Sequence, residues 1–296
     1  MLNLGIIGSS PRNGHPYSWS AIINGFDSKQ IQLCPYPIIP QYLSQAKYPD
    51  DFISNAHVSH IWTQEIKDSQ NIAKFSKIPY ICKNINELYD SVDAILLARD
   101  DYIERKSILE FLLTGTKPIF VDKPLAINKK EAEQIIANQS FPNQIFTCSS
   151  FRYSSEVEKF KSKKQTKEKI YKIDAFIQGT WDKYAIHLIE PVKSLLNIAE
   201  LTSKKNRITF IKNQKAFQLS LVYNEILINF YTSPEIENPP SIEIHFKSHS
   251  EKLILTDRFS AFRKSLESFI SGIKDDNHTV DTGDLFNTID LIQFGT

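Results

Sequence analysis

The first 25 residues, MLNLGIIGSSPRNGHPYSWSAIING, decide the fold class of this chain. Residues 2–7 form a short apolar run that ends at Gly8, and Pro16 opens a helix-like segment that Gly25 closes. Glycine is scarce, with nine in 296 residues, yet three of the nine lie within the first fourteen positions. This stretch therefore predicts a strand, a tight turn and a helix.

The alternation of strand and helix continues for about 150 residues. Apolar, strand-like runs recur with helical segments between them: strands at 57–63, 94–98, 117–122 and 144–149, and helices at 66–77, 102–114 and 129–139. Helical connections of this length imply right-handed crossovers and a mostly parallel, doubly wound sheet. Residues 34–55, with four prolines, interrupt the rhythm and are predicted to be a loop-rich insertion.

The pattern changes after about residue 150. Helical segments are predicted at 155–167, 185–198 and 258–274, and runs that alternate apolar and polar residues occur at 169–180, 207–213, 216–224, 225–231, 241–248 and 252–256. Such alternation is typical of an antiparallel sheet with one covered face. We therefore predict an α/β protein with a doubly wound parallel domain over 1–122 and an α+β domain with an open, mainly antiparallel sheet over 123–296, the boundary falling between 120 and 150.

Composition argues against several classes of function. Lys and Arg number 35 against 34 Asp and Glu, a formal charge of +1, which is unlike the basic excess of nucleic-acid-binding proteins. The three cysteines are isolated and fit neither a disulfide framework nor a CxxC metal site. No stretch approaches the ~20 apolar residues of a membrane span. We expect a cytoplasmic protein with no nucleic-acid partner, no membrane partner and no metal.

Ligands of a doubly wound sheet bind beyond the carboxyl ends of its strands, so the residues that follow each strand are candidates for a site. In the first turn, Ser10 stands where the GxGxxG pattern has its second glycine. The candidates for cofactor contact from this turn and the next two strand ends are Gly8, Ser9, Ser10, Arg12, Asn13, Thr63, Gln64, Arg99 and Asp100. An ordinary glycine turn explains the first group equally well, and no residue at the second strand end chooses between NAD and NADP.

The run FVDKPLA, residues 120–126, carries the most pointed candidate. Lys123 directly follows a strand, and Pro124 favours an extended backbone at the lysine, which aims the ammonium group into the crevice. Beside a carbohydrate hydroxyl, such a lysine can relay a proton or hold a developing alkoxide. The dipeptide alone is most simply explained as a surface lysine beside a proline that starts a loop.

Taken together, GIIGSS (5–10), ELYDSVDAILLARDD (87–101), FVDKPLAINKKEAEQII (120–136) and CSSFRYSSE (148–156) resemble the Gfo/Idh/MocA oxidoreductases over almost the full chain. Asp122-Lys123-Pro124 is similar to the Glu-Lys-Pro of that family, whose lysine serves in catalysis and substrate binding. The resemblance implies a Rossmann domain that binds NAD or NADP, with Asp122 near the cofactor, followed by an open-sheet domain for substrate binding and oligomerisation.

The same family carries Asp-xxx-His on a helix. His187 matches the histidine, Glu190 matches a trailing acid, and Lys183 stands in place of the aspartate. The spacing predicts Lys183 and His187 on one helix face, and a nearby cation favours a neutral His187 that accepts a proton. The resemblance implies a catalytic role for Lys123 and His187. Arg152 and Tyr153 match the Arg-aromatic pair of the family, which either shapes the cleft or packs the domains together. We expect substrate contacts from Arg152, Tyr153, Asp182, Lys183 and Tyr184.

These residues favour an NAD(P)-dependent oxidoreductase that acts on a sugar, polyol or sugar derivative by hydride transfer. The imperfect glycine turn and Lys183 leave open a non-catalytic nucleotide- or sugar-binding regulatory protein of the same fold. An NAD-assisted sugar lyase or glycosidase is a third reading. Two lysines and an arginine suit an acidic sugar. The resemblance also implies a homodimer or homotetramer formed through the second sheet, where strands 225–231 and 241–248 offer apolar residues.

Overall fold

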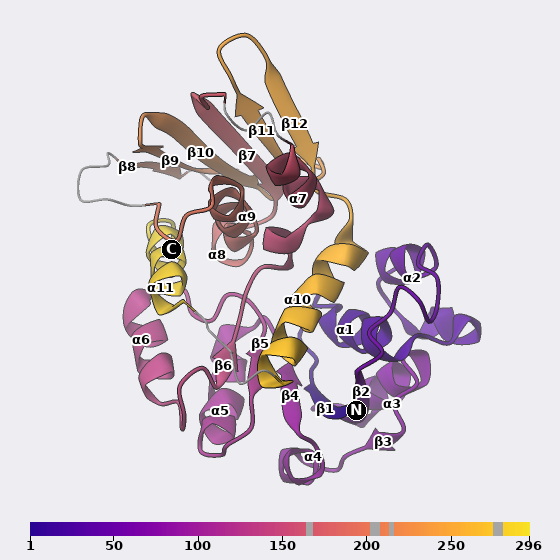
Figure 1. The fold of residues 1–296 in the computed structure, drawn as a ribbon. Coiled ribbons are helices and arrows are strands. Elements are labelled where there is room, and N and C mark those ends of the chain that lie inside the picture. The colour runs from indigo at the N-terminus through magenta and orange to yellow at the C-terminus, as the bar shows by residue number, and fades with distance from the viewer. Residues whose placement is uncertain (164–167, 202–207, 213–215, 275–280) are drawn as a thin grey trace. The chain divides into compact units, whose positions relative to one another are not determined.

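The computed structural model describes residues 1–163, 168–201, 208–212, 216–274 and 281–296 (Figure 1). These residues form two compact units, and each is considered by itself. Unit 1 contains Met1–Leu125 and Ile135–Thr147, together with the described residues from Phe262 onward that precede Asp281. Unit 2 contains Ala126–Gln134 and Asp281–Thr296, together with the described residues of Cys148–Ala261.

Unit 1 is built on a six-stranded sheet in which every strand pair is parallel. Its strands, in the spatial order β3-β2-β1-β4-β5-β6, are β1 (Leu2–Ile7), β2 (Ala56–Trp62), β3 (Tyr80–Ile81), β4 (Ala94–Leu97), β5 (Ile119–Val121) and β6 (Ile145–Phe146). The strand order reverses between β1 and β4, which is where ligands of such sheets bind. The predicted doubly wound parallel sheet is confirmed.

The helices of this half of the chain follow the predicted alternation: α1 (His15–Asn24), α3 (Ile66–Phe75), α4 (Ile85–Ser91), α5 (Tyr102–Leu113) and α6 (Lys129–Ala137). Gly25 ends α1 with a φ of 76°, a conformation that favours glycine. Sequence reasoning did not assign β3 and α4, because both are short and β3 is exposed.

The chain returns to unit 1 after it has built most of unit 2. The helix α10 (Arg258–Lys274) brings Phe269 to the rings of Phe120 and Phe146, at 5.6 and 5.9 Å between centroids. β6 likewise joins the first sheet beside β5. Long-range apolar contacts rather than chain order therefore assign Ile135–Thr147 and the described residues from Phe262 onward that precede Asp281 to unit 1, whereas the sequence analysis divided the chain into two contiguous ranges, 1–122 and 123–296.

The proline-containing insertion at 34–55 holds a short helix, α2 (Ile38–Leu43), which the sequence analysis read as loop. Pro37 occupies the helix N-cap and Pro40 lies in the first turn, two places where proline leaves no hydrogen bond unmade. The insertion packs against the N-terminal end of α1. A Cβ at Gly14 would lie 2.6 Å from Ile39 and 3.0 Å from Tyr36.

Unit 2 contains a six-stranded sheet in the order β12-β11-β7-β10-β9-β8. Its strands are β7 (Lys172–Gln178), β8 (Ile208–Lys212), β9 (Phe217–Tyr223), β10 (Ile226–Ser233), β11 (Ser241–His245) and β12 (Ser250–Ile254). β7 and β10 are parallel and the other pairs are antiparallel, which confirms the open, mainly antiparallel sheet.

Helices cover one face of this second sheet (Figure 1). They are α7 (Ser155–Ser162), α8 (Trp181–Tyr184), α9 (Ile186–Leu196) and α11 (Thr282–Gln293), with a 3-10 turn, η2 (Ser150–Tyr153), before α7. The predicted helix 155–167 ends at Ser162, and residues 164–167 lie outside the described residues, as do both ends of the predicted run 207–213. Sequence reasoning assigned no element to α11.

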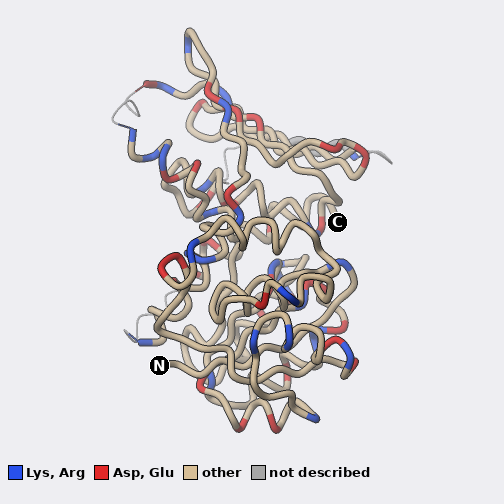
Figure 2. Tube along the Cα trace, turned by 90° about the vertical axis from the view of Figure 1, so that its right-hand side faces the viewer, with Lys and Arg blue, Asp and Glu red and all other residues tan. Residues whose placement is uncertain are grey.

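Acidic and basic residues are interspersed along both units (Figure 2), in keeping with the formal charge of +1. Over the described ranges, none of the helices is both long and apolar enough to cross a membrane.

Candidate active site

Lys123 lies just past the carboxyl end of β5, in a loop that a buried arginine holds in place. The lysine is 6% exposed, and its main-chain N–H donates to Asp122 Oδ1 at 2.8 Å. Arg105 of α5, 1% exposed, donates to four main-chain carbonyl oxygens, those of Arg99, Asp122, Pro124 and Leu125. Because the guanidinium of Arg105 binds main-chain groups, it fixes the course of the loop and with it the main-chain position of Lys123.

Asp122 is fully buried and joins the loop to the start of α1. Its Oδ2 accepts a hydrogen bond from Asn13 Nδ2 at 2.8 Å and lies 2.6 Å from His15 Nδ1. Burial by itself would raise the pKa of Asp122, but the charges of His15 and Lys123 and the two hydrogen bonds hold that pKa well below its usual range. Asp122 and Asn13, both expected to contact cofactor, use these polar groups within the protein.

The glycine turn after β1 is compact and bordered by acids. A Cβ at Gly8 would lie 2.5 Å from the ring of Pro16, so the turn requires glycine for its packing on α1. Ser9 Oγ donates to Asp68 Oδ2 at 2.7 Å, and Ser10 Oγ donates to Asp100 Oδ1 at 2.8 Å. The hydroxyls predicted to bind phosphate therefore face two carboxylates.

Three other candidates, just past the ends of β2 and β4, differ in how their polar atoms are used. Thr63 Oγ1 donates to the carbonyl of Glu65 at 2.6 Å and lies 2.8 Å from Ser69 Oγ, so this hydroxyl shapes the entry to α3. Gln64 beside it is exposed. Arg99 is 4% exposed and pairs with Asp101 through Nε and Nη2.

Within the described part of the chain, Arg99 Nη1 is a buried donor that has no hydrogen-bond acceptor. A buried unpaired donor is costly, and here it stands at the carboxyl end of β4, beside the switch point of the sheet. A ligand that offers an acceptor oxygen would satisfy this donor.

In unit 2, His187 of α9 lies against the turn that precedes η2. Its Nδ1 is 2.7 Å from Ser149 Oγ, and the main-chain N–H of Ser149 donates to Glu190 Oε2 at 2.8 Å. Burial raises the pKa of Glu190 to about 7, although the neighbouring charge of Arg152, 3.5 Å away, opposes the rise. His187 thus contacts the side chain of Ser149, and Glu190 binds its main chain.

Behind Glu190 lies a group of opposite charges in which Lys193 is buried and Arg152 and Asp284 are partly exposed. Arg152 Nη2 donates to Asp284 Oδ2 at 3.1 Å, and the ammonium of Lys193 binds Asp284 through its carboxylate and, at 2.8 Å, its main-chain carbonyl. Burial lowers the pKa of Lys193 against the pull of Asp284, whereas the carboxylates of Glu190 and Asp284 raise that of Arg152 despite its own burial. Arg152, expected at the substrate, has its charge balanced inside the unit.

Of the remaining predicted substrate residues, Asp182, Lys183 and Tyr184 lie on α8 and Tyr153 lies in η2. Tyr184 packs on Gly179, whose φ of 133° favours glycine and where a Cβ would lie 2.3 Å from the tyrosine ring. The rings of Tyr184 and His187 are 6.1 Å apart. Ala185 joins α8 to α9 with a helical backbone, which preserves the four-residue spacing between Lys183 and His187. Asp182 lies in the first turn of α8, and Tyr153 stacks under Arg152 at 5.8 Å.

The sequence analysis missed the residues that support Lys123 and His187. They are His15, Arg105, Ser149, Lys193 and Asp284. Only two of them left a usable signal. His15 follows Gly14 at a predicted helix start, and Lys193 lies one turn beyond Glu190 on a predicted helix. The partners of the others come from distant segments. Over the described residues, no three His, Cys, Asp or Glu side chains gather as a metal site.

Residues 41–144 match the model of a family described as "Oxidoreductase family, NAD-binding Rossmann fold", the Gfo/Idh/MocA family. The match covers about a third of the chain and begins after the glycine turn. A search of curated proteins gives no significant match. Solved structures share the fold over nearly the whole chain.

Three such structures illustrate the likeness. A Gfo/Idh/MocA oxidoreductase from Vibrio cholerae is 12% identical, with a TM-score of 0.66 over 99% of this chain and 95% of that one. A putative myo-inositol dehydrogenase from Sinorhizobium meliloti is 11% identical, with a TM-score of 0.70 over 99% and 95%. An oxidoreductase from Agrobacterium radiobacter in complex with NAD+, L-tartaric acid and magnesium is 11% identical, with a TM-score of 0.66 over 99% and 94%.

A parallel sheet with this switch point, joined to an open-sheet unit and matched to an NAD-binding family, defines a nicotinamide-dependent oxidoreductase. More narrowly, residues 41–144 and the fold resemble the Gfo/Idh/MocA oxidoreductases, as the motifs indicated. The cofactor is accordingly NAD or NADP. The unpaired Nη1 of Arg99 fits such a ligand, because ribose, carboxamide and phosphate groups all offer acceptor oxygens.

Proposed function

We propose that the protein transfers hydride between NAD(P) and a hydroxyl or carbonyl carbon of a sugar, polyol or sugar derivative, with Lys123 and His187 acting on the reacting oxygen. The observation that carries the proposal is the clamp on Lys123. A fully buried arginine fixes the main chain on both sides of this lysine, which a surface lysine would not need. Preorganised charge at the reacting oxygen is the usual means of catalysis in such reactions.

The bound nicotinamide supplies the site that gives or takes hydride. Of this chain's residues, Gly8, Ser9, Ser10, Arg12, Arg99 and Asp100 are proposed to line the cofactor. Lys123 is proposed to hold or move the proton of the substrate oxygen, and His187 is proposed to take part in catalysis. Tyr153, Asp182, Lys183 and Tyr184 are proposed to orient the rest of the substrate.

The proposed substrate class is supported by the substrates named for similar solved structures and not by the charge of the site residues. Similar structures include a putative myo-inositol dehydrogenase and a UDP-N-acetylglucosamine 3-dehydrogenase from Acidithiobacillus ferrooxidans, 10% identical with a TM-score of 0.67 over 99% of this chain and 96% of that one. Both names denote polyhydroxylated substrates. The expected preference for acidic sugars rested on the positive charges of two lysines and Arg152. Because the carboxylates of Glu190 and Asp284 neutralise the charge of Arg152, this residue no longer supports that preference.

The test begins with titration by NADH and NADPH, read from tryptophan fluorescence, since Trp62 ends β2. Micromolar binding of one nucleotide is expected. A panel of neutral polyols, uronic acids and nucleotide-linked sugars then identifies turnover, and Lys123→Met and His187→Gln are expected to lower kcat by about 100-fold or more. Lys130→Met, an exposed lysine of α6, is the matched control. Failure of both nucleotides to bind, or full activity of Lys123→Met, would contradict the proposal.

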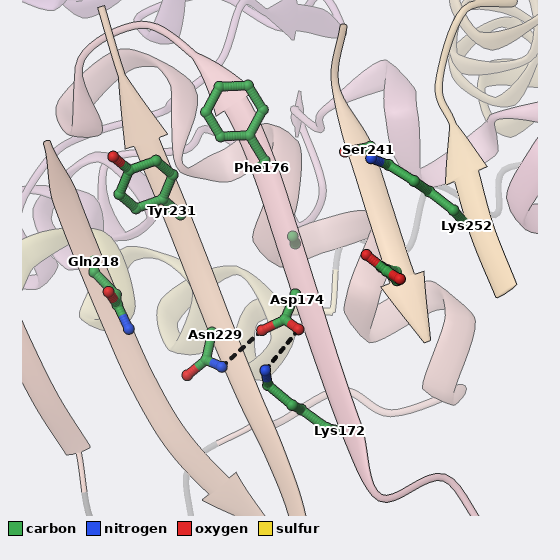
Figure 3. Close-up of a pocket in the computed structure, with 10 residues that line it drawn as sticks. Lys172, Asp174, Phe176, Gln218, Asn229, Tyr231, Ser241 and Lys252 are labelled. Atoms are coloured by element: carbon green, nitrogen blue, oxygen red, sulfur yellow. Dashed lines mark hydrogen bonds and ion pairs between the residues drawn. The ribbon is translucent and has the colours of Figure 1, made fainter. Parts of the chain in front are cut away.

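We also propose that the uncovered face of the second sheet pairs with another copy of the chain. The apolar residues expected to do this, Ile228, Phe230, Ile242 and Ile244, are fully buried in the core, because strand alternation turns them toward the helices. The opposite face carries Lys172, Asp174 and Asn229 together with Phe176 and Tyr231 (Figure 3). Pairing would be mainly polar, and light scattering that shows a monomer at micromolar concentration would rule it out.

A further inference from the structure

Ser149 and His187 form a hydrogen-bonded couple in which the serine is fully buried. Ser149 Oγ lies 2.7 Å from His187 Nδ1, and the imidazole ring is packed edge-on against Phe151 at 5.4 Å between centroids. A short contact between a hydroxyl and an imidazole nitrogen can be made with either group as the donor. Which one donates decides what the other ring nitrogen of His187 can do.

The hydrogen-bond inventory of Ser149 decides the direction. Its Oγ already accepts the main-chain N–H of Phe151 at 3.3 Å, as the N-cap of η2. A hydroxyl has one proton to donate, and in the described residues the acceptor that lies within reach of it is His187 Nδ1. The serine is 0% exposed, so water does not offer an alternative. Donation to Nδ1 leaves the proton of a neutral imidazole on Nε2.

The serine is also held from behind. Its main-chain N–H donates to Glu190 Oε2 at 2.8 Å, and Glu190 lies one helical turn from His187 on α9. The same helix therefore binds the side chain of Ser149 through His187 and its main chain through Glu190. A rotation of the hydroxyl away from Nδ1 would leave its proton without a partner in a buried place, which is unfavourable.

We propose that Ser149 is a positioning residue that keeps neutral His187 in the tautomer with its proton on Nε2, so that His187 serves the reacting oxygen as a hydrogen-bond donor and not as a base. A carboxylate in place of Ser149 would accept from Nδ1 and leave Nε2 free to take a proton; a donating hydroxyl has the opposite effect. The catalytic meaning of this tautomer rests on the proposed function.

In this arrangement the two residues have different tasks. His187 keeps its Nε2 proton throughout and stabilises negative charge on the substrate oxygen. Lys123 exchanges the proton, its ammonium becoming an amine as the oxygen of a reduced carbonyl becomes a hydroxyl, and the reverse in oxidation. When bound, the nicotinamide would supply or take the hydride that balances this proton transfer.

The tautomer is measured directly on the full-length protein labelled with 15N-histidine, by long-range proton–nitrogen correlation at a pH where His187 is neutral, with His187→Gln for assignment. The wild type is expected to show the proton on Nε2. Ser149→Ala is expected to shift the population toward Nδ1, Ser149→Thr to restore the wild-type spectrum, and Ser150→Ala to leave it unchanged. A proton on Nδ1 in the wild type, or an identical spectrum for Ser149→Ala, would overturn the proposal.

A kinetic readout separates this proposal from the function it rests on. With an active substrate, Ser149→Ala is expected to lower kcat by about tenfold with KM nearly unchanged, and Ser149→Asp to add a histidine ionisation to the pH profile of kcat. An unchanged profile for Ser149→Asp with an altered tautomer would remove the assigned role of His187. If no substrate turns over, the proposed function fails, while the spectrum still decides the tautomer.

Discussion

Lys123 and His187 are held in place by different means. Arg105 fixes Lys123 through main-chain carbonyls, whereas His187 stands on a network of side chains that includes Ser149, Glu190 and the charges beyond it. Carbonyl groups do not titrate, but carboxylates and ammonium groups do. The contacts between Arg105 and the loop of Lys123 should therefore be insensitive to pH, and the surroundings of His187 should respond to it.

The largest effect is expected from the clamp itself. Arg105→Met removes the donor to four buried carbonyls and should lower the free energy of unfolding by about 3–5 kcal/mol. Urea denaturation measures the loss. Arg263→Met is the matched control, because its exposed pair with Glu267 is worth less than about 1 kcal/mol. Equal stability of the two variants would refute the clamp.

A somewhat smaller loss is expected in the side-chain network. Asp284→Asn leaves the ammonium of Lys193 buried without its counter-charge and should cost about 3 kcal/mol. Asp290 lies on the same helix as Asp284 and forms an exposed ion pair with Lys129. Asp290→Asn breaks this pair and should lower the free energy of unfolding by less than about 1 kcal/mol. Thermal unfolding of both variants makes the comparison, and similar melting temperatures would show that the buried network contributes little.

The pH response distinguishes the two regions most sharply. Burial raises the pKa of Glu190 to about 7, so the folded state binds more protons than the unfolded state between pH 4.5 and about 7. This contribution to stability is complete below pH 4.5 and is lost as the pH rises through 7. Glu190→Gln should flatten the dependence of unfolding free energy on pH in this window by about 2 kcal/mol, and an unchanged slope would exclude Glu190 as its source.

The smallest effect concerns the acids at the glycine turn. Ser10 donates to Asp100, whose negative charge opposes a pyrophosphate. Asp100→Asn should tighten NADH binding by about tenfold, or 1.4 kcal/mol, with the gain reduced at high salt. Asp93→Asn is the control. Asp93 directly precedes β4 and accepts a hydrogen bond from the main chain of Asn3, so this change should leave the affinity for NADH unchanged. Weaker binding by Asp100→Asn would show that Asp100 contacts the nucleotide favourably.

Local patterns were enough to predict most of the elements. The apolar runs at β1, β2, β4 and β5 and the helices α1, α3 and α5 all appear near their predicted bounds, because burial imposes a period on the residues that each element contributes. The short helix α2 escaped detection because its prolines resemble those of a loop. The segments that return to unit 1 escaped because membership depends on contacts distant in sequence.

By itself the sequence determined the fold class, the strand ends where a site must lie, and the identity of the side chains there, since these follow from periodicity and from the direction of parallel strands. Only the tertiary structure decided how those side chains are used. Asp122 and Asn13 turn their polar groups inward, Arg152 is balanced by Asp284 from a helix 132 residues away, and His187 meets Ser149 across 38 residues. Hydrogen bonds between distant segments leave no periodic pattern in a sequence, so the structure alone reveals which groups are paired and which await a ligand.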